Sequence, residues 1–186
     1  MGNHSPRRQS ESGFSLLELL MSLLVIGIVS GMALVTIINV LPTLRADGGM
    51  QLVLTQLRQA RQSAVDQRRN FAVAFVGTTR MTVVRQETGG GTTAIADYFF
   101  PYQMITKVYS GLPDTPDNFG KANAVNFNGN VVVFVSDGTA VDSTGALING
   151  TVFLGIGNNP MTARAVTVMG GTGRIRSYRY NGTAFR

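Results

Sequence analysis

The longest uncharged stretch of the sequence is the feature that most restricts how this chain can fold. Residues 19–41, LLMSLLVIGIVSGMALVTIINVL, contain no charged side chain. As a helix, these 23 residues would extend about 34 Å, enough to cross a hydrocarbon layer of about 30 Å. A buried helix of a soluble domain is the less favoured alternative, because apolar residues would occupy every face. The sequence therefore predicts a transmembrane helix over residues 14–41.

A basic segment before the apolar stretch predicts its orientation. Arg7 and Arg8 lie in this segment, so we expect the N-terminus to stay in the cytoplasm and the later residues to face outward. A secretory signal peptide begins in the same way, but it is cut at a small residue after its apolar stretch. Here the small residue, Gly13, precedes the stretch, which indicates that the helix is retained.

One carboxylate lies among these apolar residues. Glu18 is flanked by Leu17 and Leu19, with no cation nearby in the sequence. A charged side chain at the bilayer centre costs at least about 2.5–3.5 kcal/mol, so such a residue is by default functional. The alternative is that Glu18 lies near the cytoplasmic interface and that its side chain reaches water.

The residues around Glu18 resemble the N-terminus of the type IV pilin and pseudopilin superfamily. The resemblance rests on GFSLLELLMSLLVIGIVSGMALV, which has a glycine, a phenylalanine, a glutamate four positions later and an unbroken apolar span. It implies that residues 1–13 are a leader peptide and that a prepilin peptidase cleaves between Gly13 and Phe14. It also implies that this enzyme methylates the new amine of Phe14, and that the chain joins other pilins or pseudopilins through N-terminal helices at an inner-membrane assembly platform.

Glu18 has a physical role in this interpretation. Cleavage would leave an ammonium group on Phe14, one helical turn away. In a filament, the ammonium of a neighbouring subunit can lie beside this carboxylate, so that each ion has a partner where water is scarce. We therefore hypothesise that Glu18 sets the register of each incoming subunit. Gly27 and Gly31 are spaced so that neighbouring helices could approach closely on one face.

The sequence after residue 41 predicts an amphipathic helix followed by a β-rich head. Pro42 is expected to kink or end the membrane part of the helix, and Gly48–Gly49 to form a loose joint. Apolar residues at helical spacing predict an amphipathic helix within residues 42–69. Residues 70–186 are expected to form the head, periplasmic in the orientation above, with strands at 71–76, 81–86, 97–103, 131–136, 151–156, 164–169 and 174–180.

The predicted order of elements indicates an α+β fold class. The strands follow one helix without βαβ alternation, which favours an antiparallel head. The resemblance implies the pilin fold, in which a long N-terminal helix packs on an antiparallel β-rich head. A helix with LRQARQSAVDQ, a strand and turn with VVFVSDGT, and a closing RAVTVMGGTGRIRSY resemble H-type minor pseudopilins and, equally, FimT- and FimU-type minor pilins. The expected function is a minor pseudopilin of type II secretion, with a minor pilin in pilus assembly or DNA uptake as the alternative.

The residue inventory argues against catalysis. The chain has no cysteine, and its one histidine, His4, lies in the predicted leader. The mature chain would then lack the commonest general base and thiol nucleophile. We therefore predict that the protein is not an enzyme and has no cofactor.

Two other sequence patterns are candidates for binding sites, one for DNA and one for a metal ion. Alternation along a strand would put Arg174 and Arg176 on one face, with Arg179 near them after a local twist. Minor pilins that capture DNA have a similar Gly-Arg-x-Arg end, and guanidinium groups suit phosphate oxygens; DNA contact is a less favoured alternative to a structural role. Asp114 and Asp117 resemble calcium ligands, but two carboxylates are too few, so we predict no metal site.

Overall fold

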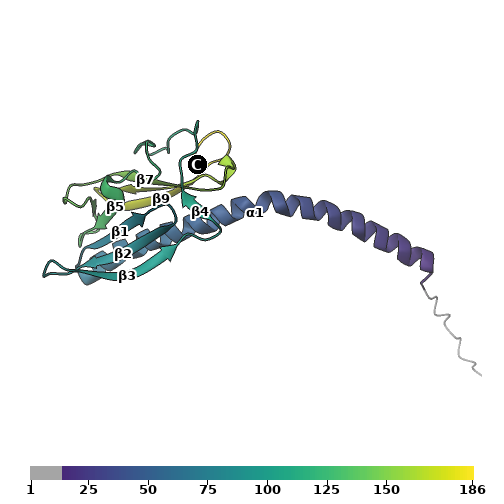
Figure 1. The fold of residues 1–186 in the computed structure, drawn as a ribbon, viewed down its shortest axis with the longest axis horizontal. Helices are drawn as coiled ribbons and strands as arrows, with labels where there is room; N and C mark the ends of the chain where they lie inside the picture. Colours follow the sequence, from purple (N-terminus) through teal and green to yellow (C-terminus); the bar gives the residue numbers. More distant parts are fainter. Residues whose placement is uncertain (1–13) are drawn as a thin grey trace, which may run out of the picture. The chain divides into compact units, whose positions relative to one another are not determined.

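The computed structural model describes residues 14–186, and the predicted leader, residues 1–13, lies outside the described residues. A long helix, α1 (Leu16–Gln67), is followed by nine strands in the described part of the chain (Figure 1). The chain divides into two compact units between Val40 and Leu41, and each is described by itself below.

The first unit consists of the N-terminal part of α1. The carbonyl of Ser15 accepts hydrogen bonds from the backbone N–H groups of Glu18 (3.0 Å) and Leu19 (3.1 Å), which starts the helix. Glu18 lies in the first turn, where a negative charge suits the helix dipole. In the described part of the chain, no helix combines the length and the hydropathy that crossing a membrane requires. The span predicted for residues 14–41 therefore stays a prediction.

The structure corrects the predicted joint in the helix. Residues 48 and 49 lie inside α1, and Pro42 is also within it. A side chain at position 49 would overlap the sulfur of Met104, so glycine allows α1 to lie close against a buried neighbour. The helix ends at Gln67, where Arg68 takes a left-handed conformation with φ of 51°. Gly49 is thus a point of close packing, and not a point of flexibility.

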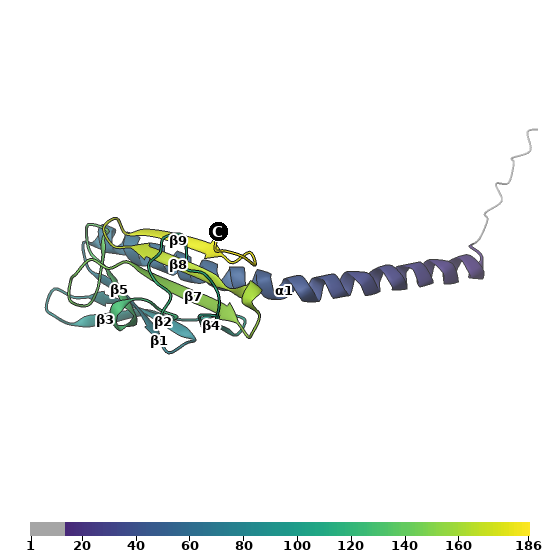
Figure 2. The same ribbon diagram turned by 90° about the horizontal axis from the view of Figure 1, so that it is seen from above.

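Two antiparallel sheets form the rest of the second unit (Figures 1 and 2). The five-stranded sheet has the order β3-β2-β1-β5-β6 and the four-stranded sheet the order β4-β7-β8-β9. The first comprises β1 (Phe71–Val76), β2 (Arg80–Gln86), β3 (Thr92–Phe99), β5 (Val131–Phe134) and β6 (Ala140–Val141). The second comprises β4 (Met104–Thr106), β7 (Gly150–Ile156), β8 (Arg164–Met169) and β9 (Arg174–Arg179). Two short 3-10 helices lie at Asn128–Asn130 and Pro160–Thr162.

The third predicted strand was misplaced. The sequence predicted residues 97–103, whereas β3 covers Thr92–Phe99. Pro101 begins a turn in which the N–H of Met104 donates to its carbonyl at 3.0 Å, and Tyr102 and Gln103 have positive φ angles of 58° and 59°. The prediction followed aromatic content, but β3 is an exposed edge strand with few large apolar side chains.

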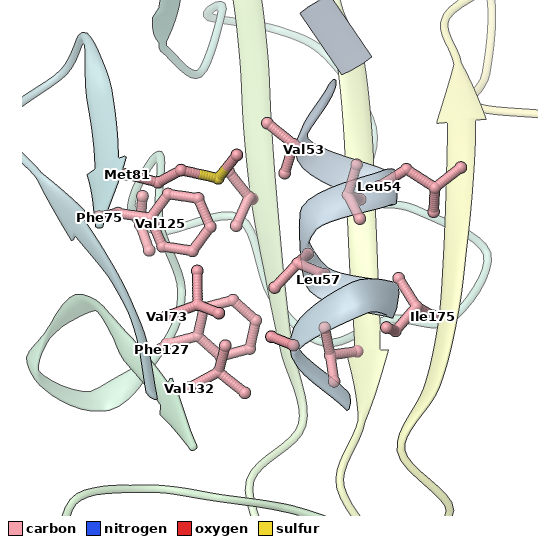
Figure 3. Packing of buried hydrophobic residues seen from close by; sticks show 14 of the residues in the cluster. Val53, Leu54, Leu57, Val73, Phe75, Met81, Val125, Phe127, Val132 and Ile175 are labelled. Carbon is pink, nitrogen blue, oxygen red and sulfur yellow. The ribbon is translucent and has the colours of Figure 1, made fainter. Parts of the chain in front are cut away.

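The core of the second unit lies between α1 and both sheets. Figure 3 shows Val53, Leu54 and Leu57 of α1 among side chains from the strands. These partners come from the five-stranded sheet, the segment before β5 and strand β9: Val73, Phe75, Met81, Val132, Val125, Phe127 and Ile175. Because both sheets contact the same helical turns, the C-terminal part of α1 is integral to the head.

A second apolar cluster covers the other face of the four-stranded sheet. Phe153 and Ala165 alternate along their strands with side chains that face the main core. Tyr109 and Leu112, from the long segment between β4 and β5, pack on this face. The middle of the sheet is therefore buried on both sides, and the covering segment brings Asp117 close to β8 and β9.

Gly173, in the turn between β8 and β9, provides a test of the packing. Its φ is 60°, and a Cβ at this position would overlap the carbonyl oxygen of Gly138. We expect Gly173→Ala to destabilise the protein by more than about 1 kcal/mol, because alanine disfavours positive φ and the backbone there cannot move freely. Thermal unfolding measures the effect. Gly171→Ala is the matched control, because a Cβ there meets nothing within 4 Å; equal losses would contradict this account.

Candidate functional site

The start of α1 presents the residues of the predicted processing and assembly site. Phe14 has 79% of its surface exposed, and every residue from Phe14 to Met32 is exposed. Ser22 Oγ donates to the backbone carbonyl of Glu18 at 2.8 Å. Among the described residues no cation pairs with the Glu18 carboxylate. Gly13 lies outside the described residues, so cleavage and methylation at Gly13–Phe14 remain predictions.

Gly27 and Gly31 leave one part of this helix free of side-chain bulk. A Cβ at either position would meet nothing within 4 Å. Close approach of a second helix would be sterically possible there, since no atom of the described residues fills the space. The predicted role of these glycines in helix packing stays a prediction.

Arg174 and Arg176 lie on one exposed face of β9, as the alternation predicted. Both are paired with Asp117, whose oxygen Oδ1 lies 3.5 Å from Arg174 and 3.4 Å from Arg176. Tyr178 donates from its hydroxyl to the other oxygen of Asp117 at 3.0 Å. The pKa of Arg176 is raised, first by its hydrogen bond with Tyr178 and also by the charge of Asp117. One carboxylate thus offsets part of the positive charge on this face.

Arg179 does not join the other two arginines. Its guanidinium pairs with Asp47 of α1, a residue that also pairs with Arg164. Arg179 thus has a different carboxylate partner from Arg174 and Arg176, and DNA contact by the three arginines stays a prediction. Sequence alternation locates side chains on one strand, but it carries no information about which carboxylate of the helix lies opposite.

The two predicted acidic loop residues both have roles within the protein. Asp114 accepts hydrogen bonds from the backbone N–H groups of Thr115 (2.7 Å) and Gly120 (2.9 Å) and so closes its own loop. Asp117 accepts from Thr167 Oγ1 at 2.6 Å and ties this loop to β8. No group of three or more acidic, histidine or cysteine side chains within residues 14–186 could hold a metal ion. Both carboxylates act as structural acceptors.

Arg164 is a buried cation that the sequence analysis missed. Its side chain has no exposed surface and donates to Asp47 at 2.6 Å. It also donates to the carbonyls of Thr43 (3.1 Å), Met161 (3.0 Å) and Ala163 (2.8 Å). This network fixes α1 to the start of β8. An arginine at the start of the largely apolar strand RAVTVM was the available signal, since such a cation needs partners if it is buried.

Arg61 connects three segments that are distant in sequence. It belongs to the LRQARQSAVDQ part of α1, and its Nε donates to the carbonyl of Gly138 at 2.9 Å. Its Nη2 donates to the carbonyl of Thr172 at 3.1 Å. These carbonyls lie in VVFVSDGT and RAVTVMGGTGRIRSY, so one side chain joins the three segments that carry the narrower resemblance.

A hollow in the described structure lies away from these residues. It has a volume of about 490 Å³ and is lined mainly by the segment from Val133 to Leu147. The side chains of Thr144 and Asn128, with backbone N–H groups, lower the pKa of Asp142 in its wall to about 2. These contacts are those of a tight turn. The residues that line the hollow include no histidine or cysteine, and its acidic side chains accept hydrogen bonds within their turns.

Comparison with known proteins identifies the N-terminal segment. A profile of the prokaryotic N-terminal methylation motif matches residues 8–34, a range that contains Gly13, Phe14 and Glu18. The chain carries the methylation motif of the type IV pilin family. The motif implies a pilin anchored in the inner membrane. No curated protein matches the sequence.

A solved structure agrees with a pilin-like fold. The minor pseudopilin EpsH from the type II secretion system of Vibrio cholerae is 13% identical, with a TM-score of 0.50 over 73% of this chain and 97% of that one. The type IV minor pilin FimU of Pseudomonas aeruginosa is 16% identical, with a TM-score of 0.48 over 70% and 85% of the two chains. The predicted α+β pilin fold, a long helix packed on antiparallel sheets, is confirmed. That the protein is not an enzyme stays a prediction, with which the methylation motif and the fold agree.

Proposed function

We propose that this protein is a minor pseudopilin, a structural subunit of a type II secretion pseudopilus. In this proposal, a prepilin peptidase removes residues 1–13 and methylates Phe14. Residues 14–41 hold the chain in the inner membrane, and the head lies in the periplasm. The observation that carries the proposal is the methylation motif at the start of a helix with exposed apolar side chains, followed by a pilin-like head.

The exposed apolar side chains support assembly with other subunits. Leu16, Leu17 and Leu20 are 77%, 68% and 55% exposed. Burying apolar surface stabilises by about 25 cal/mol per Å², so this helix gains from lipid or from neighbouring helices. Glu18 is then placed to pair with the Phe14 ammonium of another subunit, and the inner-membrane platform would bring the subunits together.

The head is consistent with a minor pseudopilin or a minor pilin. The three segments that resemble H-type pseudopilins, and equally FimT- and FimU-type minor pilins, meet at Arg61. The ion pairs of Asp117 with Arg174 and Arg176 weaken the case for DNA uptake, because they place negative charge on the face that would meet phosphate. A minor type IV pilin remains the alternative function, and the following experiment separates the two.

Deletion of the gene in its own organism tests the proposal. We expect proteins that normally reach the medium to accumulate in the periplasm, while surface pili and DNA uptake stay normal. Expression of the intact gene should restore secretion. Normal secretion together with lost pili or lost DNA uptake would instead assign the chain to a type IV pilus.

A further inference from the structure

A basic groove lies between α1 and the turn that joins β8 to β9. It has a volume of about 290 Å³ and is lined by Arg58, Arg61, Gln62, Gly173, Arg174 and Ile175. Its lining thus has three cations and no carboxylate. Water occupies roughly 30 Å³ per molecule in the liquid, so the groove has room for about ten waters or for one or two side chains.

The three arginines differ in how many of their N–H donors already have a partner within the protein. Arg61 donates to two backbone carbonyls, so its guanidinium is held in place but keeps its charge. Arg58 is exposed on α1 and pairs with no carboxylate of residues 14–186. Arg174 has 41% of its side chain exposed and reaches Asp117 only at 3.5 Å. Arg58 and Arg174 therefore line the same groove and have N–H donors without partners among residues 14–186, and Arg61, the third cation of the lining, is held in place by two backbone carbonyls.

The surroundings of the groove favour a compact anion over a long one. Asp117 contacts Arg174, and Asp137 directly precedes Gly138, whose carbonyl binds Arg61. A polyanion that continued past the groove would meet these carboxylates. Non-specific DNA binding also draws on many phosphate contacts, about 6–10 in strongly salt-dependent proteins, whereas the groove offers three cations. Two carboxylate side chains would fill it and make charge-assisted hydrogen bonds with the guanidinium groups.

We infer that this groove receives acidic side chains from a neighbouring protein subunit. The partner is a short segment rich in Asp or Glu, and Arg58 and Arg174 are the residues that bind it. The inference adds a head contact to the assembly role proposed above and rests on that role. Peptide binding by the full chain requires neither cleavage at Gly13 nor Glu18, so the two proposals can fail independently.

Fluorescence anisotropy with the full chain in detergent tests the inference. The probes are a short labelled glutamate-rich peptide and a single-stranded oligonucleotide of equal charge. We expect the peptide to bind at least as tightly as the oligonucleotide. The double variant Arg58→Gln, Arg174→Gln should lose about tenfold or more in peptide affinity, because two charge-assisted hydrogen bonds are removed. Arg186→Gln is the matched control, since it removes one exposed cation elsewhere and should leave binding unchanged.

Two results would overturn the inference. Equal peptide affinity for the wild type and the double variant would show that the groove does not bind carboxylates. Tighter binding of the oligonucleotide, lost in the double variant, would assign the groove to nucleic acid. Circular dichroism of each variant checks that the head stays folded.

Discussion

Glu18→Ala is expected to abolish incorporation of this protein into filaments while leaving its processing intact. The carboxylate lies in the first turn of α1, and the ammonium that cleavage would create on Phe14 is one turn away. Removing one member of a buried ion pair costs about 3–5 kcal/mol, which corresponds to roughly a hundredfold or more in an equilibrium constant. Sheared filaments and membrane fractions, analysed by immunoblot, measure incorporation and cleavage separately.

Ser22→Ala is the matched control for this variant. It removes the hydrogen bond from Ser22 Oγ to the Glu18 carbonyl but leaves the carboxylate in place. We expect it to be incorporated normally. The register hypothesis would be wrong if Glu18→Ala entered filaments as well as Ser22→Ala did. Loss of cleavage in Glu18→Ala would instead show that the peptidase requires this residue in order to cleave the chain.

Asp47→Ala is expected to cause the largest loss of stability among single changes in the head. Asp47 is the carboxylate partner of Arg164, whose side chain is fully buried. Removing it leaves a buried guanidinium paired only with neutral carbonyls, at a cost of about 3 kcal/mol. For a head of this size, that loss lowers Tm by roughly 6–12 °C. Thermal unfolding of the full chain, followed by circular dichroism, measures the change.

Arg179→Ala separates the buried interaction from the exposed one. Arg179 also pairs with Asp47, but 60% of its side chain is exposed. Exposed ion pairs contribute about 0–1 kcal/mol, so this variant should unfold close to the wild-type temperature. Similar losses for Asp47→Ala and Arg179→Ala would contradict the role assigned to the buried pair.

The parts of the fold that could be predicted from the sequence are those that the pattern of neighbouring residues determines. The apolar helix follows from a long uncharged stretch, and most of the longer strands and the shared face of Arg174 and Arg176 follow from periodicity along the chain. The strands β4 and β6 were missed because three and two residues carry no recognisable period. Gly49 resembled a flexible joint because its contact, Met104, is far away in the sequence.

The charged contacts of the site were the least predictable part. Arg164 and Arg179 meet Asp47 across more than a hundred residues, and Asp117 reaches β9 from a distant loop. Such pairs depend on how the helix and the covering segment dock on the sheet, and no local pattern specifies that docking. The basic groove was missed for the same reason, because Arg58 and Arg174 become neighbours only in the folded head.

The most direct test of the central claim is the mass of the protein isolated from the cells that naturally make it. The claim is that the chain is processed and then assembles through its N-terminal helix. Intact-mass and N-terminal analysis should show a chain that starts at Phe14 and carries a methyl group on its amine. A protein that still begins with residues 1–13 would contradict the account, because the ammonium that pairs with Glu18 would not exist.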